Sequence, residues 1–490
     1  MQFQVLSHAG LLLESDPTSN ALDCERLLFD PWLIGSCYWR SWWNLPEPSV
    51  SLLATIKPTA IYLTHLHWDH FHGPSLRLFD RKTPIYVPKI NHRRMVEDLN
   101  WLGFHNVTEI AHGTTVAIGA KLSLHSFQFG PSNDSAAIVT DSKQVLFNLN
   151  DCKLFGLALK ELTHRFGAPD FLLRSHSSAS AVPYCIEDYQ RLPSPRPASE
   201  YAEEFITVAK SLRAKYAIPF ASNHCFVHPE TIEFNHTAAT PQLLLDTAKK
   251  MAANPGGNQG HGTGTESSPE SSIGLSDRIK IMPPGSRFDN NGGFQIQEFD
   301  YSDVAGYVDY IRRVHADKFQ ATQKQENESY FDRTAFDNYF VPYQKSTGLF
   351  QRHDRIGFAV RNGDGSTARV KLSSRGIESY QALDEVDFEI ECHARIINDC
   401  TQIRMFSTWG ASKRLKIRLR EDAALPKVGK LLTLLDAHEH HLLPLHSNLS
   451  LRSLGVRTRR WREAAEAARL VWYKLSRGKI PSPIELYRGE

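Results

Sequence analysis

The chain has 490 residues, which exceeds one ordinary hydrophobic core, and at roughly 100 to 200 residues per domain its length predicts two or three domains. Apolar residues make up 41% and charged residues 22%, as in globular proteins, and 56 Lys and Arg against 54 Asp and Glu exclude a global polybasic field for nucleic acid. The seven scattered cysteines form no CxxC pair, so we expect reduced thiols and a cytoplasmic location.

Short strands connected by tight turns dominate the first 150 residues. The N-terminus predicts a strand, because it lacks the basic region of a signal peptide, and no apolar run is long enough to span a membrane. Stretches rich in β-branched and aromatic residues predict strands at 3–15, 26–33, 60–67, 84–88, 121–129, 135–140 and 144–151. Helices are predicted at 75–82, 91–103 and 199–216, and a strand at 216–222. This alternation predicts an α/β layered domain.

The second half of the chain is less regular. Residues 253–276 are rich in Gly, Ser, Thr and Pro, and predict a flexible surface loop. Strand-like sequence returns at residue 279, so we place the boundary of a second, smaller α+β domain near residue 300. Residues 301–490 predict a helix at 301–318, strands at 384–398, 402–410 and 414–421, and a final basic helix.

The segment HLHWDH concentrates residue types that bind metals. His65 and His67 are two apart, so at a strand end they point to the same side and can share one metal. Asp69 and His70 can reach a second metal as the chain turns. His72 falls outside this pattern.

These residues resemble the signature of the metallo-β-lactamase fold, an αββα sandwich with metals at one edge. The LSHAGLLLE and LLFDPWL stretches resemble the branch that includes N-acyl-phosphatidylethanolamine phospholipase D and L-ascorbate-6-phosphate lactonase. Residues 1–300 resemble most the metallo-β-lactamase-like domain of the CMP-N-acetylneuraminate hydroxylases, in FDPWLIGSCYWRSWWNLPEP, YLTHLHWDHFHGPSL, GPSNDSAAIVTDSKQVLFNLNDC and IPFASNHCFVHPE. Those hydroxylases also carry a Rieske domain, but this chain has no CxH and CxxH ligand pairs.

The resemblance implies further ligands. Asp151 stands where an aspartate bridges the two metals, and His224 is our choice for the last histidine, with His228 as the alternative. Gly130 stands where the fold usually has its third histidine, and His125 and Asp134 are the candidate substitutes. We therefore expect unequal sites: a tight one built from Asp69, His70, Asp151 and His224, and a weaker one that relies on His65 and His67.

Other residues have supporting roles in this interpretation. His8 and Asp30 are predicted to gate the site and orient its ligands, and His176 to lie at the active-site lip. The aromatic segment 38–44, with Arg40, suggests a pocket wall that stacks on a ring and pairs with an anion. The HEHH segment at 438–441 looks like a metal-binding pattern, but in its helix-like run it is predicted to be a solvated polar face. The basic helix at 457–479 is expected to dock on the protein itself, with a membrane surface or an acidic partner as the alternative.

Two divalent ions, zinc by preference and iron or manganese as alternatives, would lower the pKa of a bound water to about 7. This predicts a metallohydrolase acting on an ester, amide or phosphodiester bond, with Asp69 or Asp151 relaying the proton and His176 assisting. The alternative is an iron-dependent oxidoreductase on the same fold. We expect a small-molecule substrate, anionic or nucleotide-sugar-like, and neither a nucleic-acid partner nor a membrane span. A non-catalytic binding module would require the loss of more ligands.

Overall fold

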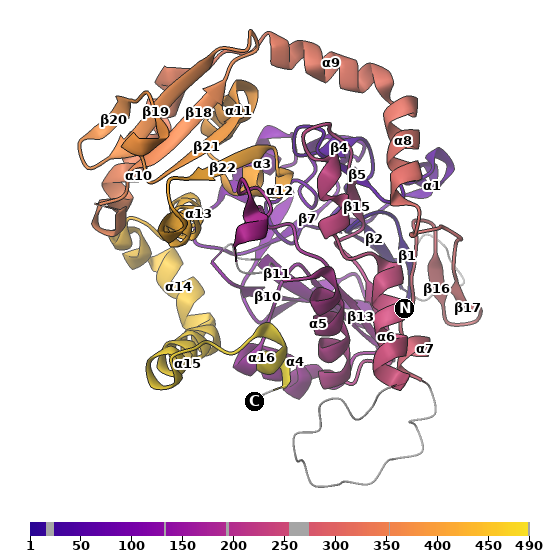
Figure 1. The fold of residues 1–490 in the computed structure, drawn as a ribbon. Helices are drawn as coiled ribbons and strands as arrows, with labels where there is room; N and C mark the ends of the chain where they lie inside the picture. Colours follow the sequence, from indigo (N-terminus) through magenta and orange to yellow (C-terminus); the bar gives the residue numbers. More distant parts are fainter. Residues whose placement is uncertain (16–23, 132–133, 193–195, 254–273, 352, 489–490) are drawn as a thin grey trace.

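The computed structural model describes residues 1–490 apart from 16–23, 132–133, 193–195, 254–273, 352 and 489–490 (Figure 1). The loop predicted at 253–276 therefore lies almost entirely outside the described residues. In the described part of the chain, no helix has the length and apolar character needed to cross a bilayer.

Two β-sheets form the centre of the N-terminal part. The first has the order β17-β16-β1-β2-β3-β6-β7-β8 and the second the order β14-β13-β12-β11-β10-β9. The strands of the first are β1 (Gln2–Val5), β2 (Leu11–Glu14), β3 (Arg26–Phe29), β6 (Ala60–Tyr62), β7 (Ile85–Pro88), β8 (Val107–Ile110), β16 (Arg287–Asp289) and β17 (Gly293–Gln295). Those of the second are β9 (Thr114–Ile118), β10 (Leu122–Phe129), β11 (Asp134–Thr140), β12 (Val145–Asn150), β13 (Phe171–Arg174) and β14 (Tyr216–Pro219).

The two-residue period of the strands sorts their apolar side chains between layers. Leu11 and Leu13 of β2 pack with Val139 and Leu146 of the second sheet in one buried cluster. The intervening Leu12 belongs to a different cluster, on the helix-covered side of the first sheet. A strand buried on both faces reads as a continuous apolar run, which is how LLL appears in the sequence.

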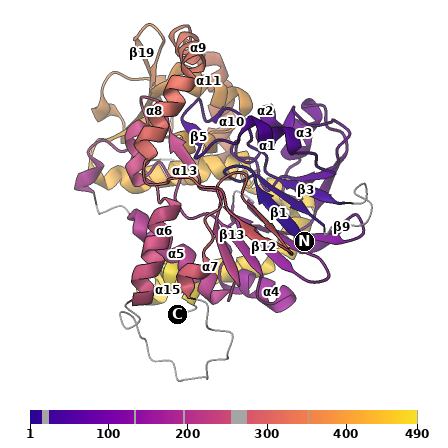
Figure 2. The same cartoon turned by 90° about the vertical axis from the view of Figure 1, so that its right-hand side faces the viewer.

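Helices cover the outer face of each sheet, and the predicted αββα sandwich is confirmed. Apolar residues of α1 (Val50–Thr55), α2 (Gly73–Leu76) and α3 (Arg94–Trp101) pack on the first sheet. Those of α4 (Gly156–Phe166), α5 (Ala198–Ser211) and α6 (Pro241–Ala253) pack on the second. Figure 2 shows the two helical layers on opposite sides of the strands. A small third sheet joins β15 (His224–Phe226), β5 (Trp42–Asn44) and β4 (Ser36–Cys37), and α7 (Leu275–Arg278) precedes β16.

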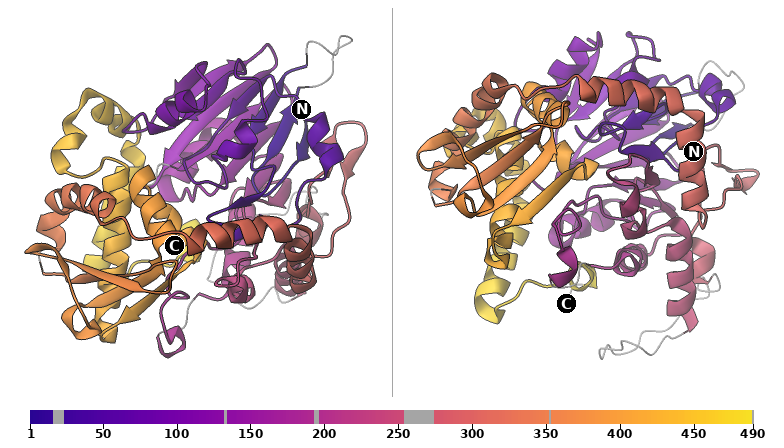
Figure 3. Two further views of the ribbon diagram at one scale, coloured as in Figure 1. Left: turned by 90° about the horizontal axis from the view of Figure 1, so that it is seen from above. Right: turned by 45° about the horizontal axis from the view of Figure 1, so that its top comes forward.

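A second lobe follows along the chain. Helices α8 (Val304–Val314) and α9 (Ala316–Asn327) run from the sandwich to a five-stranded sheet, as Figure 3 shows. This sheet comprises β20 (Gly376–Ser379), β19 (Thr367–Ser373), β18 (Ile356–Arg361), β21 (Phe388–His393) and β22 (Leu415–Leu419). It is accompanied by α10 (Arg333–Gln351), α11 (Ala394–Ile403), α12 (Ser407–Ser412) and α13 (Leu425–Glu439). The domain boundary near residue 300 stays a prediction.

The last helices return to the sandwich. They are α14 (Leu451–Arg459), α15 (Trp461–Arg477) and α16 (Pro483–Arg488), and α15 lies against α4. Glu466 of α15 is 1% exposed and accepts a hydrogen bond of 2.8 Å from the backbone N–H of Leu157, at the start of α4. On α16, the Tyr487 hydroxyl accepts a 3.0 Å hydrogen bond from the buried Arg174 guanidinium. The C-terminal segment therefore forms part of the body that holds the first 220 residues.

Two strand predictions were wrong. Residues 402–410 lie at the end of α11 and in α12, because Met405, Phe406 and Trp409 are buried at helical spacing rather than in alternation. Of residues 278–288, only the end joins β16, and Ile279 makes an isolated bridge to Ala217. The predicted basic helix is also two helices, divided at Arg460.

Candidate metal centre

The site forms where loops leave the strand ends at one edge of the sandwich. The loop after β6 carries His65, His67, Asp69 and His70, and Asp151 follows β12 directly. Strands β3 and β6 are parallel, as are β12, β13 and β14. The carboxyl ends of parallel strands meet at one edge, which is where such loops build sites.

One group of donors combines two histidines with a carboxylate. His65 Nε2 lies 2.9 Å from His67 Nδ1 and 3.9 Å from Asp134 Oδ1, and one ligand atom from each residue lies within 4.8 Å of the others. Asp134 begins β11, so its side chain is placed by a regular strand. Among the two sequence-based substitutes for the third histidine, the structure brings Asp134 to the group.

A second set of donors surrounds His70. Its Nε2 lies 3.2 Å from Asp69 Oδ2 and 3.3 Å from Asp151 Oδ2, and His8 Nε2 lies 3.1 Å from the same Asp69 oxygen. His8, Asp69 and His70 form one candidate ligand group, and His65, His70 and Asp151 form another. Because His65 belongs to two groups, the donor sets adjoin each other. His8 was expected to act as a gate, but its ring nitrogen lies close enough to Asp69 and His70 to share a metal ion with them.

Asp30 orients His70 from behind. Its Oδ2 lies 3.0 Å from His70 Nδ1, and its carboxylate accepts hydrogen bonds from the backbone and hydroxyl of Thr64 and from the Asn150 amide. Asp30 is 0% exposed. A carboxylate on Nδ1 fixes the tautomer that leaves Nε2 as the donor, as metal-binding histidines require. The placement of Asp30 agrees with its predicted orienting role.

Buried imidazoles without partners line the inner side of the site. His224 stacks on Trp42 with ring centroids 3.5 Å apart, and its ring lies 5.4 Å from that of His8. His8 Nε2 faces the Asp69 carboxylate, whereas both ring nitrogens of His176 and His224 have no hydrogen-bond partner among the described residues. Buried polar groups are almost always satisfied, so these nitrogens fit a group that the protein binds. His224 and His176 nevertheless fall outside the three candidate ligand groups.

Electrostatics prepare the donors for a cation. Burial, with His70 and His67, holds the pKa of His65 well below its usual value, which keeps its imidazole neutral. Burial, then the neighbouring Asp151 and Asp436, raises the pKa of Asp134 to about 8. Burial works against ionisation of Asp69, but His70 and His8 hold its pKa well below the usual range. Closely spaced carboxylates of this kind favour a bound positive charge.

Other sequence candidates lie elsewhere. His125 bonds to Thr115 at 2.7 Å and packs on Phe166, away from the site. Gly130 has a φ of +79°, which disfavours a histidine there, and its backbone N–H and carbonyl bond to Glu463 and Arg460. His228 Nδ1 accepts from the backbone of Glu230, on another face.

Two residues of the surroundings were missed. The solvated-face prediction for residues 438–441 was wrong at His440, which is buried with its Nδ1 3.3 Å from His92 Nε2. No local pattern could show this, because His92 is 348 residues away. Tyr38 was predicted as pocket wall, but its hydroxyl also donates to Asp69 Oδ1 at 2.5 Å.

Comparisons with known proteins give partial similarity. No protein-family model matches the chain. A Mycobacterium tuberculosis protein named as a Rieske 2Fe-2S iron-sulfur protein is 26% identical over 262 residues, covering 50% of this chain and 48% of its own. The cytidine monophosphate-N-acetylneuraminic acid hydroxylase of Mus musculus is 30% identical over 159 residues, or 31% of this chain and 26% of the hydroxylase. The chain thus spans about half the length, or less, of these relatives.

Solved structures give a similar result. The isothiocyanate hydrolase from Delia radicum gut bacteria is 14% identical, with a TM-score of 0.41, covering 59% of this chain and 99% of the hydrolase. A likeness at this level carries no argument about function. The partial similarity to the hydroxylases agrees with the resemblance seen in the sequence, whereas the narrower branch with the phospholipase and the lactonase stays a prediction.

Proposed function

We propose that the chain is a dinuclear metalloenzyme whose first ion is held by His65, His67 and Asp134. The second would be held by Asp69 and His70 with His8 or His224, and Asp151 would lie between them. The support is the convergence of three candidate ligand groups at one strand edge, with the imidazole nitrogens of His176 and His224, which have no hydrogen-bond partner among the described residues, beside them. This keeps five of the six predicted ligands, leaves His224 and His8 as alternatives for the sixth, and adds Asp134.

The reaction that this donor set favours is oxidation by an iron centre. The carrying observation is that two histidines and one carboxylate, in His65, His67 and Asp134, replace the three histidines expected from the resemblance. A two-histidine, one-carboxylate set with open positions is typical of non-haem iron oxygenases, and bound iron would supply dioxygen activation. The similarity to relatives named as hydroxylases points the same way.

The net chemistry is hydroxylation. One oxygen atom of dioxygen enters a substrate C–H bond and the other leaves as water, which consumes two electrons and two protons. The two electrons require a reductant. An iron–sulfur or flavin protein could deliver them one at a time. The sequence-based choice of zinc therefore becomes the second candidate, with manganese a further alternative.

The protein's own residues would set the geometry. Asp30 holds His70 through Nδ1, so that Nε2 faces Asp69 and Asp151. Tyr38 bonds to one oxygen of Asp69 and leaves the other facing His8 and His70. Asp151 keeps 30% of its side chain exposed, which suits the predicted exchange of a proton with a substrate. His176 is 1% exposed, which suits a buried position beside the site better than the predicted place at its lip.

Hydrolysis remains the second candidate, because the partly exposed Asp151 lies within reach of both donor sets and could take a proton from a water between them. The hydrolase interpretation needs no reductant. It predicts zinc in the purified protein and turnover without dioxygen.

Metal analysis decides between the two. Protein purified without chelator, under nitrogen, should contain iron at close to two ions per chain and consume dioxygen with a chemical reductant. Asp134→His, which offers a three-histidine set, should shift the metal content toward zinc, whereas His125→Asn should leave it unchanged. Zinc in the wild type with no dioxygen consumption would refute the oxygenase proposal and leave the hydrolase.

We propose a small molecule as the substrate and no nucleic-acid partner. The cytoplasmic location stays a prediction.

The face of α15 away from α4 is exposed and bears Val471, Trp472 and Leu475 with Lys474 and Arg477. An apolar stripe beside basic side chains suits the surface of an anionic membrane. We therefore keep this contact as a proposal, although the opposite face of α15 docks on the sandwich.

A further inference from the structure

A large cavity lies beside the metal centre without including its ligands. Its volume is about 1550 Å³, and its lining comes from residues between 34 and 102 in the sandwich and between 318 and 447 in the second lobe. Pockets for organic ligands commonly form between such units and have volumes of about 300 to 1,000 Å³. The cavity could therefore accommodate a sizeable organic molecule.

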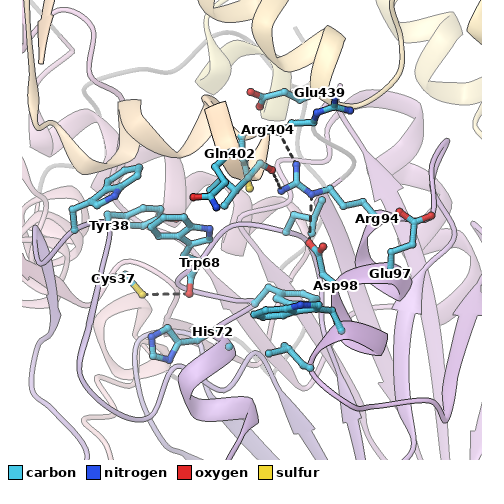
Figure 4. Close-up of a pocket in the computed structure, with 18 of the residues that line it drawn as sticks. Cys37, Tyr38, Trp68, His72, Arg94, Glu97, Asp98, Gln402, Arg404 and Glu439 are labelled. Carbon is cyan, nitrogen blue, oxygen red and sulfur yellow. Dashed lines mark hydrogen bonds and ion pairs between the residues drawn. The ribbon is translucent and has the colours of Figure 1, made fainter. Parts of the chain in front are cut away.

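Aromatic rings form one wall of the cavity. Tyr38 and Trp68 are stacked, with centroids 5.7 Å apart and planes 9° apart, and Trp39 packs on Trp68 at 4.8 Å. Figure 4 shows Tyr38 and Trp68 side by side at this wall, with Cys37 and His72 below them. Tyr38 is 1% exposed and lies behind Trp68, whereas Trp39 and Trp68 are partly exposed and can stack on a planar group.

Positive charge faces this aromatic wall. The lining holds seven Arg and Lys residues against four Asp and Glu. Arg94 is committed to structure, because its guanidinium donates to the carbonyls of Ile403 and Arg404 at 2.5 and 2.7 Å (Figure 4). Arg40 donates to Thr322 and Ser36 and lies near Glu326. Arg77 and Arg404 are exposed, and neither forms an ion pair with a carboxylate within the described part of the chain. A guanidinium without a carboxylate partner is a ready donor for an anion.

We propose that this cavity is a binding site for an organic anion that carries a planar ring. The ring would lie on Trp39 and Trp68, with Tyr38 buried behind them, and the anionic group would pair with Arg404 or Arg77. The site goes beyond the metal ligands and stands whichever metal or reaction proves correct. It nevertheless adjoins the metal centre, because Tyr38 bonds to Asp69 and the Cys37 thiol donates to the carbonyl of Trp68 at 3.2 Å.

A matched set of probes tests the proposal on the full chain with its native metal. The probe is (naphthalen-1-ylmethyl)phosphonate, which joins a ring to an anion through a C–P bond that hydrolases do not cleave. Naphthalen-1-ylmethanol supplies the ring alone and methylphosphonate the anion alone. In calorimetry, the joined probe should bind one site per chain at least tenfold more tightly than either part, and it should quench tryptophan fluorescence.

Variants locate the site. Arg404→Gln and Arg77→Gln change exposed side chains and should weaken the joined probe at least fivefold together, whereas Arg375→Gln, an exposed arginine outside the cavity, should change nothing. Protein stripped of metal should bind the probe within threefold of the untreated protein. The proposal would be overturned if the joined probe bound no more tightly than its two halves, or if the double variant bound it as well as the wild type. It would also be overturned if removal of the metal abolished binding of the probe. The last result would place the phosphonate on the metal and leave the proposed function intact.

Discussion

Asp134→Asn should have opposite effects on the metal-free and the metal-bound protein. In the metal-free state, burial and the nearby carboxylates raise the pKa of Asp134 from 3.8 to about 8. Between these values the native state holds a proton that the unfolded chain releases, so the native state loses stability as pH rises. Over the interval from 3.8 to pH 7, at about 1.4 kcal/mol per unit, the loss is about 4 kcal/mol. Asparagine fills the same space without titrating.

Urea unfolding of the stripped proteins between pH 4 and pH 7 measures this effect. The variant should gain up to about 4 kcal/mol over the wild type across that interval. Metal titration should show the reverse, with one ion bound at least tenfold more weakly, because a carboxylate donor is lost. Parallel pH curves for the two proteins would show that the Asp134 carboxyl is solvated. An unchanged metal titration would show that it is not a ligand.

Three further outcomes follow from the structure. Metal added to the stripped protein should bind in two steps, with His70→Ala abolishing the tighter and His65→Ala the weaker, and two equal steps in the wild type would contradict the assignment. His72→Asn should make the protein less sensitive to acid. Burial lowers the pKa of His72 from 6.5 to about 4, so the wild type loses about 3 kcal/mol of folding stability as pH falls through that range. Asparagine does not titrate and keeps the helix cap, so unfolding curves of the two proteins that stay superimposed would refute this. Vesicles containing phosphatidylserine, but not phosphatidylcholine alone, should sediment the protein, and Trp472→Ser with Leu475→Ser should release it; equal sedimentation of the double variant would count against α15 as the contact.

Local strand and helix patterns predicted an α/β layered domain, the family resemblance implied the sandwich, and the core of the candidate site could be predicted because its residues are close in the sequence. His65, His67, Asp69 and His70 lie within six residues, and the loop after one strand brings them together. The choice between His125 and Asp134 could not be made from spacing, because it depends on strand register. Asp134 pairs with Phe129 at the end of the β10–β11 hairpin, and only this pairing directs its carboxylate to His65.

Residues of the second lobe were the least predictable. The burial of His440 depends on His92, and the cavity walls come from segments more than 200 residues apart. Such contacts leave no periodic pattern in either segment. The strand prediction for residues 402–410 was wrong for a related reason. β-branched and aromatic residues occur in any buried element, and tertiary packing decides between helix and strand.

The position of β1 has a consequence for how the protein is made. This first strand pairs on one side with β2, but on the other with β16, where Gln4 lies opposite Arg287. At about 5 to 20 residues per second, a ribosome needs roughly 15 to 60 s to supply that partner after β1 has emerged. During this time one edge of β1 offers free backbone groups to any neighbouring strand. We expect nascent chains of this protein to need chaperone protection until residue 289 leaves the ribosome, and early termination to favour aggregation.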